Sequence, residues 1–226
     1  TRIHYVITRG GEAPNVVPDF AEVYYYVRHP QAEKLQQLWK RVIDISTAAA
    51  LGTGTDVDVE VMHGNHSLLP NEKLSRQMHA NLTKVGGVRY NAEEQAFAEE
   101  ISSSLGVGDF MGMEREILRF ELRQGMGSTD VGDVSWVVPT VGLRTSTWVP
   151  GTAPHSWQAI AAGGTSIGTK GMRVAAKALS LTARDLLLDP QLIEAGWAEF
   201  ELRRGKNFHY KALLGNREPP LAYRIK

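Results

Sequence analysis

The chain has 226 residues, enough for one large domain or two small ones, and its mixed composition is typical of globular proteins. Its 25 Lys and Arg residues balance its 25 Asp and Glu residues, so no overall charge favours nucleic acid or an anionic membrane as a partner. The absence of cysteine excludes disulfides and thiolate metal sites within the chain.

The N-terminal segment is predicted to be a small α+β unit. Residues 2–8 and 20–28 are rich in alternating β-branched and aromatic side chains, which predicts two strands joined by a turn-rich connection. Apolar residues at helical spacing predict a helix between Pro30 and Gly52, and the alternating stretch 55–63 predicts a third strand. Strand, strand, helix, strand is most of an α+β sandwich. Because the chain enters its first strand at once, we expect preceding sequence to be missing.

The character of the chain changes between residues 65 and 70, which predicts a domain boundary there. Asn71 and Asn91 are predicted to cap two amphipathic helices, the second with Glu94 as its capping-box partner. The carboxylate pairs at 93–94 and 99–100 are expected to lie in solvent on the exposed side of that second helix.

The remaining chain is predicted to contain loops, short strands and two further helices. Residues 106–133 are rich in glycine and methionine and indicate a loop, and residues 134–149 indicate two short apolar strands, the first limited by Pro139. A glycine-rich turn then leads into a helix over residues 173–188, and Asp189 with Pro190 opens the last helix.

The stretch GGTSIGTKGM, residues 163–172, invites comparison with a phosphate-binding loop. Such a loop places lysine directly after its last glycine and then Ser or Thr for magnesium, whereas Thr169 intervenes between Gly168 and Lys170. A glycine turn at a helix N-terminus is the better interpretation. A second option is that N–H groups of this turn face an anionic substrate.

Histidine is the best metal ligand left without cysteine, but the seven histidines form no complete metal site that the sequence reveals. His63 and His66 are separated by a predicted strand end and a loop. In GSTDVGDVSW, residues 127–136, hydrogen-bonding side chains gather in a glycine-containing loop, which is equally typical of an Asx or Ser/Thr turn. His155 lies in a Pro/Gly loop between two tryptophans, where structural and catalytic roles are both open.

Three segments in this order resemble a known family: GGEAPNVVPDFAEVYYYVR at 10–28, GSTDVGDVSWVVPT at 127–140 and PGTAPHSWQ at 150–158. They are similar to the metal-dependent amidohydrolase and peptidase family of aminoacylases, hippurate hydrolases and carboxypeptidase G, and most similar to its aminobenzoyl-glutamate hydrolase group. The resemblance implies an α/β protein with an α+β lid. Residues 1–68 would be a ferredoxin-like lid and dimerisation domain without its first strand and helix, and residues 69–226 the C-terminal part of an α/β catalytic domain.

The resemblance implies hydrolysis of the amide bond of an N-acyl, aminobenzoyl-like amino acid by metal-activated water. It implies two divalent ions, zinc or manganese, in the complete enzyme, although this chain alone need not bind either. His155 matches the last metal ligand. Asn15 and Arg28 match lid positions that reach the partner's active site, Asn15 as a catalytic donor to a developing oxyanion and Arg28 as the anchor of a substrate carboxylate.

Ser128, Thr129 and Asp130 match the loop that lines the substrate pocket in the family, and we expect them to bind substrate. The other metal ligands and the general base have no matching residues in this chain. The expected partners are a small N-acyl amino acid, a second copy bound through the lid, and the missing N-terminal half, with neither nucleic acid nor membrane. Since no signal-peptide-like segment or apolar run of roughly 20 residues occurs, we expect a cytoplasmic protein. The alternative function is a non-catalytic dimerisation module or an inactive truncated subunit.

Overall fold

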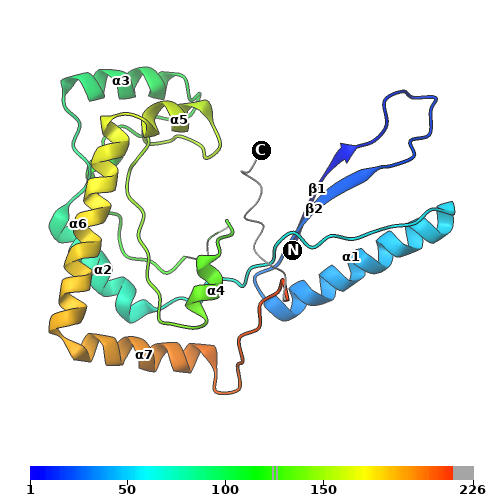
Figure 1. Ribbon diagram of the computed structural model, residues 1–226. Coiled ribbons are helices and arrows are strands. Elements are labelled where there is room, and N and C mark those ends of the chain that lie inside the picture. Colours follow the sequence, from blue (N-terminus) through cyan, green and yellow to red (C-terminus); the bar gives the residue numbers. More distant parts are fainter. Residues whose placement is uncertain (124, 126, 216–226) are drawn as a thin grey trace, which may run out of the picture. The chain divides into compact units, whose positions relative to one another are not determined.

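The computed structural model describes residues 1–123, 125 and 127–215, and its chain divides into two compact units (Figure 1). The first unit consists of Thr1–Leu68, Ser128–Asp133 and the described residues from Tyr210 onward. The second consists of Leu69–Gly127 and Val134–His209. The assignment of residues 69–226 to one catalytic domain stays a prediction, and the structure groups part of that range with the first unit.

The first unit contains a β-hairpin and one long helix. Strands β1 (Arg2–Arg9) and β2 (Glu22–Arg28) pair antiparallel, with Arg2 opposite Arg28 and Tyr5 opposite Tyr25. Helix α1 (Ala32–Thr53) packs against β2 and ends at Gly54, whose φ of 69° is left-handed and therefore suits glycine. The two predicted strands and the predicted helix are confirmed, and so is the mixed α+β class of this part of the chain.

Helix α1 is amphipathic, but the hairpin beside it stays open. The large apolar side chains of the helix that are half-buried are Leu35, Leu38, Trp39, Val42 and Ile43. Ile45, which has the same apolar character, is 59% exposed. On the hairpin, Tyr5 is 67% and Ile7 is 60% exposed. The sheet therefore presents apolar side chains to the outside in this chain, which is unusual for the middle of a strand.

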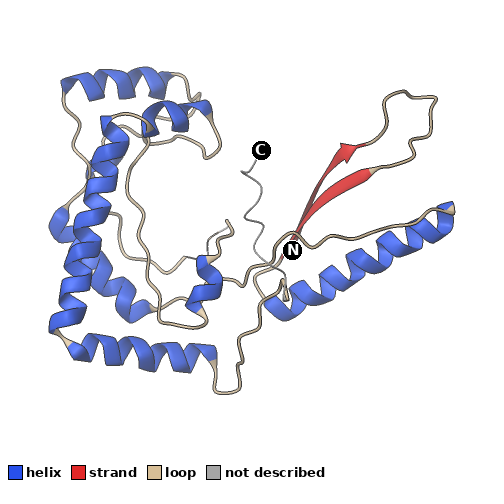
Figure 2. Cartoon of the chain, in the orientation of Figure 1, coloured by secondary structure: helices blue, strands red, loops and turns tan. Residues whose placement is uncertain are grey.

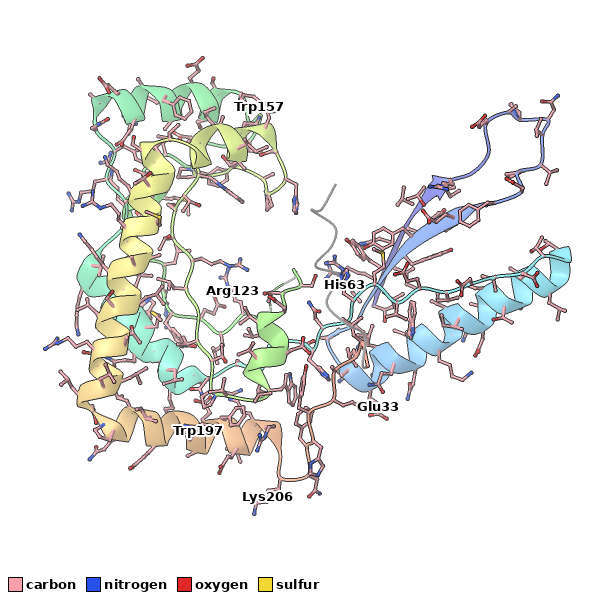
Figure 3. The ribbon with its side chains drawn as sticks, viewed as in Figure 1. Glu33, His63, Arg123, Trp157, Trp197 and Lys206 are labelled. Carbon is pink, nitrogen blue, oxygen red and sulfur yellow. The ribbon has the colours of Figure 1, made fainter. Side chains whose placement is uncertain are left out.

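The predicted third strand over residues 55–63 is wrong in this structure. The segment carries no strand assignment, and the described residues form one two-stranded sheet, β1 with β2 (Figure 2). Alternation of side chains indicates extended backbone, whereas a strand also needs a regular hydrogen-bond ladder. The segment ends at His63, which is labelled in Figure 3. This end approaches the hairpin, because the ring centres of His63 and Tyr26 lie 6.1 Å apart.

The second unit is helical in its described residues (Figure 2). Its elements are α2 (Glu72–Val85), α3 (Ala92–Ser103), the 3₁₀ turn η1 (Met113–Arg115), α5 (Trp157–Gly163), α6 (Ser166–Leu188) and α7 (Pro190–Arg204). Helix α6 packs against α2, α5 and α7. A buried cluster of apolar side chains joins α3, α5, α6 and the loop before α5, and its members are Ala98, Ile101, Val149, Ala162 and Ile167.

Asparagine side chains begin two helices of this unit, as predicted. Asn71 accepts the N–H of Leu74 at 3.1 Å and donates to the carbonyl of Gly196 at 2.8 Å, which ties α2 to α7. Asn91 accepts the N–H of Glu94 at 2.8 Å while the Glu94 carboxylate accepts the N–H of Asn91 at 2.7 Å, a complete capping box. These caps satisfy N–H groups that a helix start otherwise leaves without partners.

The two short strands predicted over residues 134–149 are wrong. A short helix, α4 (Val131–Ser135), begins this stretch, and loop follows it. The apolar character of the segment does not reflect a sheet: Val134, Val137 and Val138 are 40–53% exposed, and the buried apolar residue of the segment is Val149, at its end in the second unit. Val149 is 1% exposed, and the hydroxyl of Thr145 donates to the carbonyl of Gly171 in α6 at 2.9 Å.

Helix α6 starts earlier than predicted, at Ser166 instead of residue 173, so most of the glycine-rich stretch is helical. The side chain of Thr165 accepts the N–H of Ile167 and begins the helix. Gly168 and Gly171 permit close contacts. A Cβ on Gly168 would lie 2.2 Å from the carbonyl oxygen of Gly163, and one on Gly171 would lie 2.3 Å from that of Ser146.

Among the helices of the described residues, none is both long enough and apolar enough to cross a bilayer.

Candidate functional site

Arg28 is the last residue of β2, at the end of the hairpin away from its loop. The side chain is half-buried, and its guanidinium carbon lies 5.0 Å from the centre of the Tyr26 ring, a cation–π arrangement that holds the group in place. In the described part of the chain, Arg28 forms no ion pair. A positioned guanidinium of this kind is suited to a carboxylate from outside the chain.

Asn15 lies at the other end of the hairpin. It is an exposed turn residue in the connection between β1 and β2, next to a turn in which the N–H of Val16 donates to the carbonyl of Ala13 at 3.2 Å. At about 3.3 Å per residue, β2 alone puts about 20 Å of strand between that connection and Arg28. The structure therefore does not bring Asn15 and Arg28 together.

Ser128, Thr129 and Asp130 form an exposed turn at the start of α4. The Thr129 hydroxyl accepts the N–H of Val131 at 3.3 Å, and the carbonyls of Thr129 and Asp130 accept the N–H groups of Gly132 and Asp133 at 3.1 and 3.0 Å. The Ser/Thr turn that the sequence left open is thus present. The three side chains stay accessible, so the turn does not exclude a role in binding.

Asp133, which follows this turn, connects segments that are far apart in sequence. Its Oδ2 accepts the backbone N–H of His66 at 3.2 Å, and its Oδ1 accepts the hydroxyl of Tyr210 at 3.0 Å. His66 donates from Nε2 to the carbonyl of Lys211 at 2.9 Å. Burial and the neighbouring Asp133 carboxylate raise the pKa of Tyr210, which keeps its hydroxyl protonated as the donor.

His155 lies in the loop directly before α5, in the second unit. It is exposed, and its backbone φ of 61° makes it the one non-glycine residue with positive φ in the part of the chain that the structure describes. Ser156, the next residue, begins α5 by accepting the N–H of Ala159 at 3.2 Å. Left-handed backbone at a residue other than glycine costs of order 1 kcal/mol, and such strain is concentrated at functional positions.

The described residues do not assemble a metal centre. No group of three or more His, Asp or Glu side chains in residues 1–123, 125 and 127–215 is arranged to hold an ion. His63 and His66 are not a ligand pair, because the first lies against Tyr26 and the second against Tyr210, with ring centres 6.1 and 5.6 Å apart. His155 is accessible and able to supply one imidazole, which by itself is too few ligands for any of the proposed ions.

Glu94 is not in solvent, which corrects the expectation for this one member of the carboxylate pairs, whereas Glu93, Glu99 and Glu100 are exposed as expected. It is 6% exposed, ion-pairs with Lys170, and accepts the Ser166 hydroxyl at 2.6 Å. Burial alone would raise the pKa of Glu94, but the hydrogen bonds from Lys170, Ser166 and the Asn91 N–H outweigh it and lower the pKa. Lys170 also donates to the carbonyl of Arg89 at 3.0 Å, so its ammonium serves the fold rather than a phosphate.

Near this ion pair, burial and the charges of Glu114 and Glu94 raise the pKa of Tyr90 to about 12. Glu114 is 2% exposed and accepts the N–H of Gly112 at 2.8 Å. Tyr90 therefore stays a neutral phenol across the physiological pH range. The sequence did not point to Tyr90 or Glu114 as site residues, because nothing in the pattern around a single Glu or Tyr indicates that its side chain is buried.

The first 53 residues match the family described as the peptidase dimerisation domain. The chain is 36% identical over 220 residues to one of the subunits of the p-aminobenzoyl-glutamate hydrolase of Escherichia coli, a match that covers 85% of this chain and 46% of that protein. It is also 32% and 30% identical over 204 residues to the Xaa-Arg dipeptidases of Mus musculus and Homo sapiens, each match covering 89% of this chain.

The chain spans less than half the length of these relatives: 46% of the bacterial protein and 41% and 40% of the two dipeptidases. All three are hydrolases by name, and the bacterial relative is a subunit of its hydrolase. The resemblance stated from the sequence is thereby confirmed: the chain is similar to these hydrolases over most of its own length, and its first 53 residues match the peptidase dimerisation domain.

Proposed function

We propose that this chain supplies the lid and the C-terminal part of a metal-dependent hydrolase that cleaves the amide bond of an N-acyl amino acid. The observation that carries the proposal is Arg28, a held guanidinium without an ion pair among the described residues, at the end of a strand in the segment that matches the peptidase dimerisation domain. The names of the relatives share one chemistry, an amide bond to an amino acid, glutamate in one case and arginine in the others.

Arg28 would bind the carboxylate of the amino acid that leaves. A bidentate guanidinium–carboxylate pair fixes both the position and the orientation of the substrate. Stacking on Tyr26 restricts the guanidinium before substrate arrives, which lowers the entropic cost of forming that pair. Since the α-carboxylate is common to glutamate and arginine, this contact alone would not select between the two.

The proposed role of Asn15 is to donate from its amide to the scissile carbonyl as negative charge develops there. The scissile carbonyl and the α-carboxylate of an N-acyl amino acid are only a few bonds apart, whereas about 20 Å of strand separates the two side chains. Asn15 and Arg28 of one chain act on the same substrate molecule only if the connection at 10–21 folds back along the hairpin.

The proposed activity includes two divalent ions, zinc or manganese, which when bound would activate water and polarise the carbonyl. His155 would contribute one imidazole to one of these ions. The remaining ligands would come from outside the described residues. The chain's own contribution to the reaction would therefore be to bind and orient substrate through Arg28 and the Ser128–Asp130 turn, with Asn15 donating to the scissile carbonyl and His155 supplying one imidazole.

The second candidate function is a dimerisation module without catalysis, which the exposed hairpin favours. Tyr5, Ile7 and Val6 are all more than half exposed in the segment that matches the dimerisation domain. Light scattering on the purified chain measures its mass in solution, and a dimer without hydrolysis would support this second function.

The experiment that tests the proposed function uses both this chain alone and the protein that carries it. Each is stripped with chelator, supplied with zinc or manganese, and assayed with p-aminobenzoyl-glutamate and with a Xaa-Arg dipeptide. We expect metal-dependent release of the amino acid by the protein that carries the chain. If neither preparation hydrolyses either class of substrate with either ion, the proposed function is wrong.

A further inference from the structure

Asp133 lies in α4, and in the part of the chain that the structure describes it is the one residue of 128–133 whose side chain binds two other segments. Its carboxylate accepts from the His66 N–H and from the Tyr210 hydroxyl, which lie 67 and 77 positions away. A carboxylate has two oxygens that accept and none that donates, so it satisfies both donors at once. Asparagine, the neutral side chain of the same size, has only one acceptor oxygen and therefore cannot offer a separate oxygen to each donor.

The contact is reinforced by the backbone on either side. A Cβ on Gly132 would lie 2.0 Å from the carbonyl oxygen of His66, so the two segments touch main chain to main chain. His66 is 9% exposed, its ring lies 5.6 Å from that of Tyr210, and its Nε2 donates to Lys211. The cluster of His66, Gly132, Asp133 and Tyr210, hereafter the Asp133 cluster, is therefore a tight junction of three chain segments.

The cluster holds the loop Ser128–Asp133 within the first compact unit, although the sequence on both sides of the loop belongs to the second. The same unit carries Arg28. The turn Ser128–Asp130 accepts two backbone hydrogen bonds from the residues that follow it: the N–H of Gly132 donates to Thr129, and the N–H of Asp133 donates to Asp130. The position of the turn therefore depends on what Asp133 binds.

We propose that Asp133 is a positioning residue for substrate binding: it holds the polar turn Ser128–Asp130 in the unit that carries Arg28. Asp133 does not touch substrate and acts through the turn. The proposal deepens the proposed function and, in its claim about substrate, rests on it. This role requires a carboxylate at position 133, because the His66 N–H and the Tyr210 hydroxyl both donate to it.

The test compares four variants of the protein that carries the chain. Asp133→Ala removes both acceptors, Asp133→Asn retains one carbonyl oxygen, and Tyr210→Phe removes one donor while keeping the ring against His66. Asp109→Ala is the matched control, an aspartate that accepts an N–H, that of Met111 at 2.9 Å, within its own loop in the second unit.

Two measurements are made on each variant. Hydrogen–deuterium exchange follows the amides of Gly132 and Asp133, and steady-state kinetics separates KM from kcat. For Asp133→Ala we expect exchange about 10-fold faster at these amides and KM about 10-fold higher, with kcat within about 2-fold, because the loss is of binding rather than of chemistry. In Asp133→Asn and Tyr210→Phe, the exchange rate and KM should lie between those of wild type and Asp133→Ala. In Asp109→Ala both quantities should equal those of wild type.

Different results overturn the proposal in different ways. Unchanged exchange in Asp133→Ala means that the carboxylate does not hold the loop. Faster exchange with unchanged KM means that the loop does not serve substrate, and a fall in kcat and melting temperature without a change in KM means that Asp133 is merely structural. A wild-type protein that hydrolyses nothing contradicts the proposed function and the substrate half of this proposal together, whereas the exchange result still decides the anchoring half.

Discussion

The two compact units of this chain differ in what their charged side chains contact. In the second unit several polar groups bind one another: Glu94 binds Lys170, and Asn71 caps α2 and binds α7, although the buried Tyr90 hydroxyl has no hydrogen-bond partner among the described residues. In the first unit the hairpin leaves Tyr5 and Ile7 exposed, and Arg28 forms no ion pair among the described residues. The second unit also exposes apolar side chains, among them Ile160 at 80% and Leu202 at 83%. The first unit therefore differs from this helical scaffold mainly in carrying a held guanidinium without an ion pair among the described residues, which is suited to binding a group from elsewhere.

This difference predicts that substitutions in the second unit lower stability, whereas those in the hairpin lower activity. Gly168→Ala should have the largest effect, a loss of about 3 kcal/mol in the free energy of unfolding, because its Cβ would meet the Gly163 carbonyl at 2.2 Å. Urea denaturation measures it. Gly164→Ala is the control, since a Cβ there would lie 3.7 Å from the Ile160 carbonyl oxygen, an ordinary contact distance, and should be tolerated.

Arg28→Ala tests the other side of the comparison. In the protein that carries this chain we expect KM for an N-acyl amino acid to rise about 100-fold, because a charged anchor is worth roughly 2–5 kcal/mol, while the free energy of unfolding changes by less than about 0.5 kcal/mol. The KM of Arg28→Lys should lie between those of wild type and Arg28→Ala, because lysine keeps the charge but lacks the planar guanidinium that binds a carboxylate with two hydrogen bonds.

Arg9→Ala is the matched control for Arg28, since Arg9 also stacks on an aromatic ring, that of Phe20 at 5.6 Å, but at the opposite end of the hairpin. Kinetics of Arg9→Ala should equal wild type. Equal losses in both variants would show that the hairpin needs its charges in general and would remove Arg28 from the proposed site.

Glu94→Gln should cost about 2 kcal/mol at pH 7, because it leaves the Lys170 ammonium beside a neutral group in a mostly buried position. The pKa of Glu94 is lowered on folding, so the carboxylate stabilises the fold above the ordinary value of 4.5, and this contribution disappears as pH falls through the lowered pKa.

The stability of wild type should therefore decline below about pH 4.5 more steeply than that of Glu94→Gln. Glu93→Gln, at the exposed neighbouring position, should behave as wild type in both respects. Thermal melting at pH 3 and pH 7 measures this, and parallel curves for wild type and Glu94→Gln would contradict the assignment.

His155 gives the smallest expected effect on stability and separates its two possible roles. Because its φ is 61°, His155→Gly should be as stable as wild type or up to about 1 kcal/mol more stable, and His155→Ala should be less stable than the glycine variant. If the imidazole is a metal ligand, both variants should bind less zinc or manganese by elemental analysis. Full occupancy in both would leave only the backbone role.

Local signals allowed much of the fold to be predicted. The hairpin, α1 and the two asparagine caps follow from alternation, helical spacing and side chains that bond within a few residues. Glu94 shows the limit of such local signals. Its capping-box partner Asn91 is three positions away and was predicted, whereas its ion pair with Lys170, 76 positions away, was not. The stretch 134–149 was predicted wrongly because a run of apolar residues indicates neither a sheet nor burial by itself: Val134, Val137 and Val138 are 40–53% exposed, and Thr145 contacts α6 by a hydrogen bond.

The candidate site was predictable only where the family resemblance supplied it. Nothing in the spacing of Arg28 or His155 distinguishes them from surface residues, and the part of the chain that the structure describes does not assemble a metal centre around His155. Asp133 was visible in its polar loop, but its role depends on His66 and Tyr210, which no sequence pattern connects to it. Long-range pairings of this kind are set by the tertiary structure.

The open hairpin has a consequence for measurements on this protein. An apolar sheet that becomes covered only when a second copy binds is stabilised by mass action, because a partner that binds the folded state lowers the free energy of that state in proportion to the logarithm of its concentration. If the lid dimerises as proposed, the melting temperature of the first unit should rise with protein concentration, while that of the second unit should stay constant. Dilution would then loosen the half of the molecule that carries Arg28 and leave the scaffold intact.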